Sequence, residues 1–305
     1  MKMLKIIGLG LSLFYASLSF AEEALLKTYI LAKKTSGDMA SVVSATKQKL
    51  TTAGYTVVGE YAPYSSATII IVTNDALKQN AAASKYGAFG AAQRVTVTKV
   101  GDEIQVGFTN PVYMANVYRM QENLSNVSDD LKKTLGYMGE YGPEKGLTAS
   151  ALRDYQYKWL MPYFTDKLEL ASFGNYQTAV DKVEAALAGA NKGGVKKVYR
   201  IDIPGKQETV IGVHMTGPSN VECSGDKYIM DSIDFKAVKS SGHLPYEVIV
   251  SGGKVYTLPA EFRIAISFPD LSMMGSNSFA SIMCAPTAIQ EALTYGVGGV
   301  MSSDE

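Results

Sequence analysis

Apolar and polar residues alternate through residues 94–118, and this alternation predicts two strands. The first strand reads RVTVTKV, the second reads EIQVGFT, and the turn between them is Val100-Gly101-Asp102. Asn110 and Pro111 come next. This pair is typical of a helix start, because Asn caps free backbone N–H groups and Pro fits the first helical turn. The stretch therefore predicts a hairpin followed by a helix.

A similar pattern recurs at residues 263–293. Both stretches begin with Ala-x-x-Arg and continue with alternating apolar residues, a turn, a second strand, Pro and an apolar helix. We interpret the recurrence as an internal duplication with a longer turn in the second copy. Arg94 and Arg263 would then occupy equivalent places at the starts of two strands.

The first copy is expected to extend over residues 28–120. Its pattern predicts strands at 28–32, 55–60 and 67–72 and helices at 36–53 and 75–84, followed by the hairpin and its helix. Strands that alternate with helices in this way predict an α/β sandwich, in which helices cover a sheet.

The alternation of strand and helix patterns does not continue through residues 121–166, and we expect a helical linker there. Its main helix is predicted at 148–161, where Tyr155 and Trp159 lie among other large side chains and Pro162 ends the pattern. Aromatic residues in such a helix either cement two domains or line a groove for an apolar ligand or partner.

The second copy is expected at residues 167–295. Strands are predicted at 168–172, 195–203 and 209–215, with an amphipathic helix at 176–190. We interpret 216–259 as an insertion that holds a strand at 228–233 and a hairpin at 247–258, without a counterpart of the second helix. The shared module would return at Ala260, and the tail 296–305 would be flexible.

These elements predict an α/β protein, more narrowly an α+β sandwich. It would consist of two similar small domains, each with an antiparallel or mixed sheet covered by helices, joined by the helical linker. The first domain would span 22–120 and the second 167–295.

The first 21 residues have the pattern of a signal peptide. Lys2 and Lys5 precede a short apolar run, and Ser19 and Ala21 are small residues at the positions read for cleavage. A periplasmic or secreted protein is therefore expected, with no stable membrane span after removal of the signal. The chain carries 29 basic and 29 acidic residues, a balance that predicts no nucleic-acid partner.

Several short motifs resemble the bacterial domain-of-unknown-function family 302. They are Ser36-Gly37-Asp38, Val42-Val43 with Leu50, Ala53-Gly54-Tyr55, the stretch from Ala91 to Arg94, and Phe108-Thr109-Asn110-Pro111. The resemblance covers residues 28–120 well and 168–293 only weakly, through the internal repeat. It implies a small α/β sandwich and export, and it implies no catalytic residue.

The mature chain would contain two cysteines, Cys223 and Cys284. In an oxidising compartment an even pair first indicates a disulfide. An alternative is a metal site in which His214 joins the two sulfurs, in a redox or copper-handling protein. No ligand spacing diagnostic of a metal site is present, and no cofactor is expected.

Two further sets of residues are candidates for binding. Arg94 and Arg263 would hold an anion in a cleft between the copies, or else pair with a carboxylate such as Glu103 or Glu261. Tyr155 and Trp159 would line a groove on the linker.

The catalytic alternatives are weaker. No nucleophile elbow or phosphate loop is present. Asp231 and Asp234 flank Ser232 and Ile233 in the strand predicted at 228–233. Strand alternation would place the two carboxylates on opposite faces, where they make a poor acid–base pair.

We therefore expect a binding role rather than catalysis. The partner would be an unknown small ligand or a periplasmic protein, and a homodimer is a further possibility. The alternatives left open are the redox or copper-handling protein and an enzyme with an unrecognised cleft site.

Overall fold

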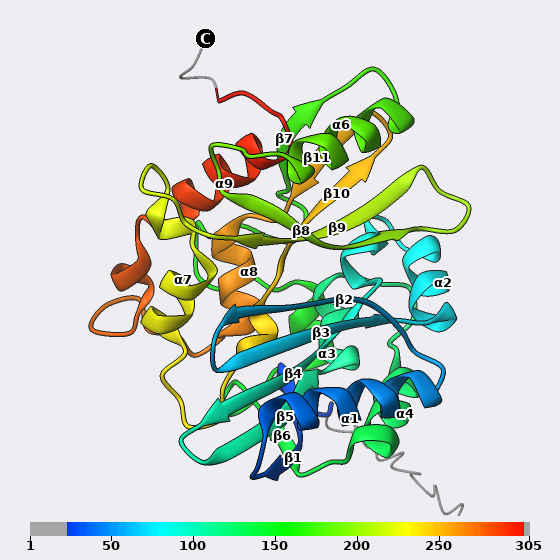
Figure 1. Ribbon diagram of the computed structural model, residues 1–305, viewed down its shortest axis with the longest axis vertical. Helices are drawn as coiled ribbons and strands as arrows, with labels where there is room; N and C mark the ends of the chain where they lie inside the picture. The colour runs from blue at the N-terminus through cyan, green and yellow to red at the C-terminus, as the bar shows by residue number, and fades with distance from the viewer. Residues whose placement is uncertain (1–22, 302–305) are drawn as a thin grey trace, which may run out of the picture.

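The computed structural model describes residues 23–301. The predicted signal peptide lies outside the described residues. Two antiparallel sheets of six and five strands, together with helices, make up the described chain. The predicted α+β sandwich is confirmed (Figure 1).

The first half follows the predicted order of elements. It contains β1 (Tyr29–Thr35), α1 (Met39–Thr52), β2 (Thr56–Tyr64), β3 (Ala67–Thr73), α2 (Asp75–Ala83), β4 (Gln93–Val100), β5 (Glu103–Thr109) and α3 (Pro111–Val117). Its helices begin where short polar side chains satisfy free N–H groups. Asp38 accepts from the N–H of Ser41, and Asn110 accepts from the N–H of Val112.

The second half repeats this order. It contains β7 (Leu168–Ser172), α6 (Tyr176–Ala188), β8 (Val195–Asp202), β9 (Glu208–Met215), α7 (Asp226–Ile233), β10 (Tyr246–Ser251), β11 (Lys254–Thr257) and α8 (Ala260–Ser267). One further helix, α9 (Ala285–Gly296), follows. Element by element, α7 corresponds to α2 and the hairpin β10–β11 corresponds to β4–β5.

This correspondence corrects two predictions about the second copy. Residues 228–233 form part of helix α7 rather than a strand, so 216–259 contains the second helix and the hairpin of the repeat and is not an insertion. Arg263 lies inside helix α8 rather than at a strand start. Seven of the eight residues of α8 are buried, so no polar face marks a helical period in its sequence.

Apart from β6 (Gly139–Tyr141), an edge strand found only in the first sheet, the two sheets have the same topology. Their strand orders are β2-β3-β4-β5-β1-β6 and β7-β11-β10-β9-β8. In both halves the first strand returns to pair with the last strand of the hairpin. The register shifts also recur in equivalent strands. The shift on β1 lies between Leu31 and Lys33, and the equivalent strand β7 has one opposite Val255 and Tyr256. The equivalent edge strands β2 and β8 each have a shift as well.

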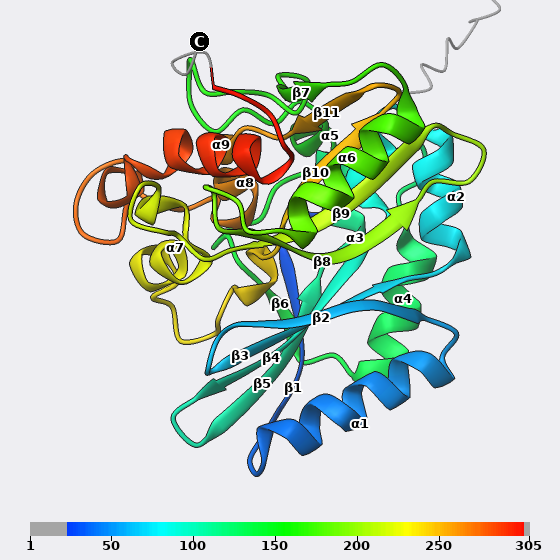
Figure 2. The ribbon, with the colours of Figure 1, turned by 45° about the horizontal axis from the view of Figure 1, so that its top comes forward.

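The halves stack as four layers (Figures 1 and 2). Helices α1 and α4 cover the outer face of the six-stranded sheet, and α6 and α9 cover the outer face of the other sheet. The edge strands β2 and β8 approach closely in the middle. A Cβ atom on Gly59 would lie 2.7 Å from the carbonyl oxygen of Val198, so this approach depends on glycine.

The linker and the tail differ from their predictions. The linker contains α4 (Ser125–Leu135), α5 (Ala149–Arg153) and β6 (Gly139–Tyr141), which extends the first sheet. The helix predicted at 148–161 ends at Arg153, and the chain continues through turns. At the C-terminus, α9 includes Gly296 and Val297 is fully buried. Residues 302–305 lie outside the described chain.

The predicted disulfide is confirmed. Cys223 and Cys284 are bonded to each other across 61 residues of sequence. The bond ties the segment before α7 to the start of α9, the helix that packs on the outer face of the second sheet as α4 does on the first. Within residues 23–301 no helix is both long and apolar enough to cross a bilayer.

Replacing both cysteines with alanine should lower the free energy of unfolding by about 4 kcal/mol, because the bond restricts the unfolded chain. Denaturant unfolding monitored by tyrosine fluorescence and circular dichroism would measure the change. A reducing agent should shift the wild-type protein to the same midpoint and leave the double variant unaffected. Equal midpoints for the oxidised wild type and the double variant would contradict this role.

Candidate functional site

The face that the first sheet turns toward the second half is polar. Along β4, Val95 and Val97 face the helices, while Arg94, Thr96 and Thr98 alternate with them on the inner face, and all of these residues are buried. Thr98 Oγ1 lies 3.0 Å from Ser241 Oγ in the second half. The interface between the halves is therefore held by polar contacts as well as by apolar packing.

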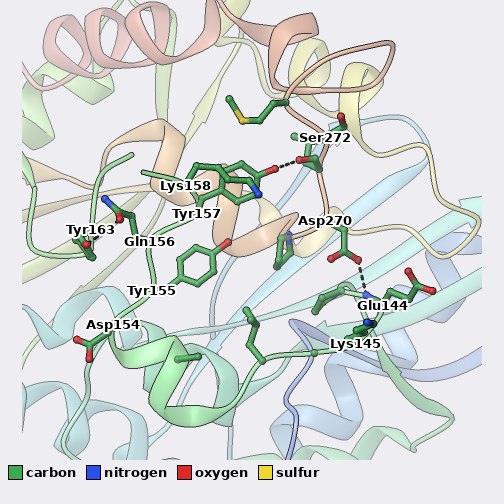
Figure 3. A pocket seen from close by; sticks show the side chains of 17 residues that line it. Glu144, Lys145, Asp154, Tyr155, Gln156, Tyr157, Lys158, Tyr163, Asp270 and Ser272 are labelled. Carbon is green, nitrogen blue, oxygen red and sulfur yellow. Dashed lines mark hydrogen bonds between the residues drawn. The ribbon is translucent and has the colours of Figure 1, made fainter. Parts of the chain in front are cut away.

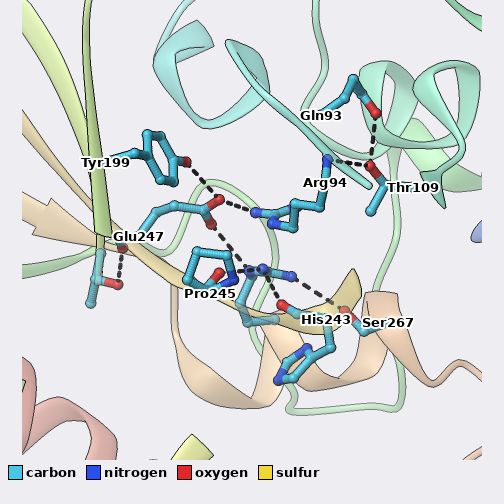
Figure 4. A network of polar contacts seen from close by, with 10 residues as sticks. Gln93, Arg94, Thr109, Tyr199, His243, Pro245, Glu247 and Ser267 are labelled. Carbon is cyan, nitrogen blue, oxygen red and sulfur yellow. Dashed lines mark hydrogen bonds and ion pairs between the residues drawn. The ribbon is translucent and has the colours of Figure 1, made fainter. Parts of the chain in front are cut away.

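A buried ion cluster lies in this interface (Figure 4). Arg94 on β4 forms an ion pair with Glu247 on β10, the equivalent strand of the second half. Arg263 on α8 places its Nε atom 3.5 Å from the other oxygen of the same carboxylate. Tyr199 donates its hydroxyl to Glu247 Oε1 at 3.1 Å.

Backbone carbonyls and a serine hydroxyl add hydrogen bonds to the cluster. Arg263 Nη2 donates to the carbonyl oxygens of His243 at 2.6 Å and of Pro245 at 3.1 Å. Its Nη1 donates to Ser267 Oγ at 3.2 Å. Burial, and then the neighbouring charge of Arg263, lower the pKa of Arg94 from its ordinary value.

The two arginines singled out in the sequence thus do converge on one anion. That anion is Glu247 of the chain itself, rather than Glu103 or Glu261. Arg94 and Arg263 are only 3% and 2% exposed. This geometry gives both side chains a role in joining the halves and leaves neither open to an external ligand.

The substitution Glu247→Gln should destabilise the protein by about 3–5 kcal/mol, because it leaves two buried guanidinium groups without their carboxylate. Denaturant unfolding would measure the loss. The matched control is Glu103→Gln, which removes a half-exposed partner of Lys34 and should change stability little. Equal losses in the two variants would contradict the importance of the cluster.

A groove of about 870 Å³ lies between the linker and a loop of the second half (Figure 3). We call it the linker groove. It is lined by residues of 143–158, by Tyr163, and by residues 269–273. Tyr157 donates its hydroxyl to the carbonyl oxygen of Leu271, and its ring stacks at a tilt 4.9 Å from Phe279. These contacts fix one wall of the groove to the other.

The two aromatic residues predicted to line a groove fare differently. Tyr155 does line the linker groove and is anchored below it, because its hydroxyl donates to the carbonyl oxygen of Ala265 at 3.1 Å. Trp159 is 84% exposed and is not among the lining residues.

Polar side chains surround the aromatic part of the groove. Asp154, Gln156 and Lys158 come from the linker, and Asp270 comes from the facing loop. Asp270 accepts from the backbone N–H of Glu144 at 2.6 Å. Sequence reasoning missed Asp270 and Met273, because they join the groove only through contacts between distant segments.

The residues of the alternative metal site, His214, Cys223 and Cys284, are engaged in other interactions. The sulfurs of Cys223 and Cys284 are bonded to each other, and His214 Nδ1 lies 2.8 Å from Asp226 Oδ2. Burial raises the pKa of Asp226, and the hydrogen bond from His214 opposes that rise. In residues 23–301 no group of three or more His, Cys, Asp or Glu is arranged to hold a metal ion.

A second cavity opens at the junction of the two halves, and we call it the inter-half cleft. Its volume is about 370 Å³. The first half contributes Tyr64, Ser66, Thr98 and Lys99, and the second half contributes Asp231, Asp234 and Lys239, along with Met230 and Phe235. The prediction that Asp231 and Asp234 face opposite ways was wrong. They lie at the end of a helix, where a spacing of three places them on one side.

Asp234 has an unusual environment. It is 8% exposed, and both of its carboxylate oxygens accept from the backbone N–H of Ser240, at 3.0 and 3.1 Å. Burial raises its pKa to about 6, against opposing effects of that hydrogen bond and of Lys239.

No family model, curated protein or solved structure matches the chain. The resemblance to family 302 therefore stays a prediction.

The substitution Asp234→Asn should stabilise the protein more at pH 7 than at pH 4. The folded state holds the Asp234 proton more tightly than the unfolded state does, so wild-type stability falls as pH rises from about 4 to 6. Asparagine retains the acceptor for Ser240 and carries no charge. The free energy of unfolding of the variant minus that of the wild type should therefore increase by about 3 kcal/mol between pH 4 and pH 6.

Urea unfolding of both proteins at pH 4, 5, 6 and 7 would test this expectation. Each pair of measurements shares its buffer, so effects common to the two proteins cancel. A difference between the proteins that does not change with pH would contradict the raised pKa of Asp234.

Proposed function

We propose that the protein is a periplasmic or secreted binding module whose linker groove receives an extended segment of a partner protein. The observation that carries this proposal is the groove itself. It combines a tyrosine-lined interior with charged groups of both signs, and its two walls come from segments about 110 residues apart in sequence.

The lining of the groove supports binding. Tyr157 offers a rigid, partly exposed surface at a low cost in side-chain entropy, because its hydroxyl group is already fixed to a backbone carbonyl. Tyr155 is buried beneath it and supports the floor of the groove. Aromatic-lined grooves with polar edges are a recurring way of binding extended peptides. The volume lies in the upper part of the range for small-molecule pockets, which gives room for several peptide residues.

The chemistry of the surrounding groups also favours binding over catalysis in this groove. Asp270 is engaged by the backbone N–H of Glu144 and lies 3.7 Å from Lys236. Gln156 donates to the carbonyl oxygen of Met161 and accepts from Tyr163. Such a set of fixed donors and acceptors provides orientation for a bound segment.

The proposed location rests on separate observations. The disulfide is of the kind that persists in oxidising compartments, and the N-terminal sequence has the pattern of an export signal. The resemblance to family 302 implies export, in agreement with the disulfide and with the N-terminal pattern. A homodimer would be one form of partner binding, in which a second copy supplies the segment.

Photo-crosslinking in cells would test the groove. A photoreactive amino acid replaces Met273, which is 42% exposed in the groove, or Tyr137, which is 55% exposed outside it. Irradiation should give a discrete adduct from position 273 and none from position 137. No adduct at 273, or the same adducts at both positions, would overturn the proposal.

The adduct would then be identified by mass spectrometry and its partner purified. The substitution Tyr163→Ala should weaken binding of that partner at least about tenfold, because exposed aromatic residues in grooves tend to dominate binding energy. Tyr137→Ala is the matched control and should bind as wild type does. Isothermal titration calorimetry would measure both. A small molecule bound in place of a protein would appear in native mass spectra of the wild type.

A further inference from the structure

The repeated architecture creates two equivalent crevices between the halves. In one, the turn between β8 and β9 faces the end of α2, and in the other the turn between β2 and β3 faces the end of α7. Figure 1 shows α2 and α7 on opposite sides of the molecule. Both crevices follow from the fold, so a difference in the side chains that occupy them is a property of one crevice alone.

The crevice at α2 is bridged by side chains of the second half. Lys206 from the β8–β9 turn donates to the carbonyl oxygens of Ser84 at 2.6 Å and Ala81 at 3.4 Å. Glu208 accepts from the backbone N–H of Ala88 at 3.1 Å. Lys206 thus satisfies carbonyl oxygens at the end of α2, and Glu208 satisfies an N–H group of the short helical turn Gly87–Gly90 that follows it.

The crevice at α7 is the inter-half cleft, and it is open. We propose that this cleft binds a small zwitterion of amino-acid size, which carries one ammonium and one carboxylate group. The proposal goes beyond the linker groove, since it concerns a different cavity, different residues and a different class of ligand.

The carboxylate side of the cleft suits an ammonium group. Asp231 and Asp234 both line it from the end of α7. Asp231 is exposed and also forms an ion pair with Lys227, one turn earlier on the same helix. Asp234 is nearly buried, and among the described residues no cationic side chain lies within 4 Å of its carboxylate, which is held by a single backbone N–H. Burial raises its pKa to about 6. The charge of Lys239 acts on this carboxylate without a direct ion pair, and a ligand ammonium would supply that direct pair.

The basic side of the cleft suits a carboxylate. Lys99 is exposed at the end of β4 and forms no ion pair with the described residues. Lys239 is fixed by donating to the backbone carbonyl oxygen of Asp234 at 2.6 Å. Charges of both signs therefore face one cavity, and they match a ligand that carries both signs.

The remaining lining sets the size and polarity of the ligand. Tyr64, Ser66 and Thr98 bring hydroxyl groups from the first half, while Met230 and Phe235 add apolar surface from the second. The volume of 370 Å³ lies at the lower end of the range for small-ligand pockets. Cavities between domains are frequent places for such ligands.

The test uses the purified mature protein and the twenty standard amino acids as probes. Isothermal titration calorimetry at pH 7.5 should find at least one that binds with a dissociation constant below about 1 mM. Its N-acetyl derivative lacks the ammonium charge and its amide lacks the carboxylate, and each should bind at least tenfold more weakly. Failure of all twenty to bind, or equal binding of either blocked form, would overturn the proposal.

Two exposed positions give variants that should fold normally. Asp231→Asn and Lys99→Met should each weaken binding of the same amino acid at least tenfold. Asp154→Asn, in the linker groove, is the matched control and should bind as wild type does. Wild-type affinity in both cleft variants would also overturn the proposal.

The same variants separate the two sites. Cleft variants should give the normal adduct from position 273 in the linker groove. An amino acid whose binding is lost with Asp154→Asn but retained with Asp231→Asn would place the ligand in the linker groove and refute the cleft.

Discussion

The carboxylate of Glu247, held between Arg94 and Arg263, is the interaction on which the arrangement of the two halves depends. It joins β4 to β10, the equivalent strands of the two sheets, and α8 to both. Charges removed from water cost several kcal/mol each unless they are paired and hydrogen-bonded. Here Tyr199 and two backbone carbonyls add hydrogen bonds to the ion pairs, so much of the cost is offset when the halves meet in this arrangement. Among the described residues, Arg94 Nε, Arg263 Nε and Glu247 Oε2 have no hydrogen-bond partner.

That constraint explains where open surfaces remain. The centre of the interface is occupied by the chain's own charges, and no ligand reaches the arginines there. The linker groove and the inter-half cleft lie at the borders, where segments from different parts of the chain meet without filling the space. A rigid interface is useful to both, because each cavity needs its two walls held at a fixed separation.

Local patterns located the first half with good accuracy and the second half less well. The hairpin at β4–β5 and the helix after Asn110 follow from alternation and capping, which act within a few residues. The helix α7 was predicted as a strand, since a short apolar run fits either period. Whether this segment is a helix or a strand depends on its neighbours in the fold, which include the disulfide and a turn of the other half.

The candidate sites were harder to predict because they depend on contacts between distant segments. Tyr155 stood out as an aromatic residue in the linker, while Asp270 and Met273 gave no local signal. Because the segment of α7 was predicted as a strand, Asp231 and Asp234 were expected on opposite faces. The helix places them on one side.

The polar face of β4 shows the limit of alternation most clearly. Arg94, Thr96 and Thr98 form the pattern of a strand with one face in water, yet all three are buried, and Arg94 and Thr98 contact the second half. Alternation reports only that the two faces differ in polarity. Whether the polar face meets water or another polar surface depends on a partner that the local sequence does not contain. In this protein the partner is the second half of the same chain, and the linker groove and the inter-half cleft lie at the borders of that pairing.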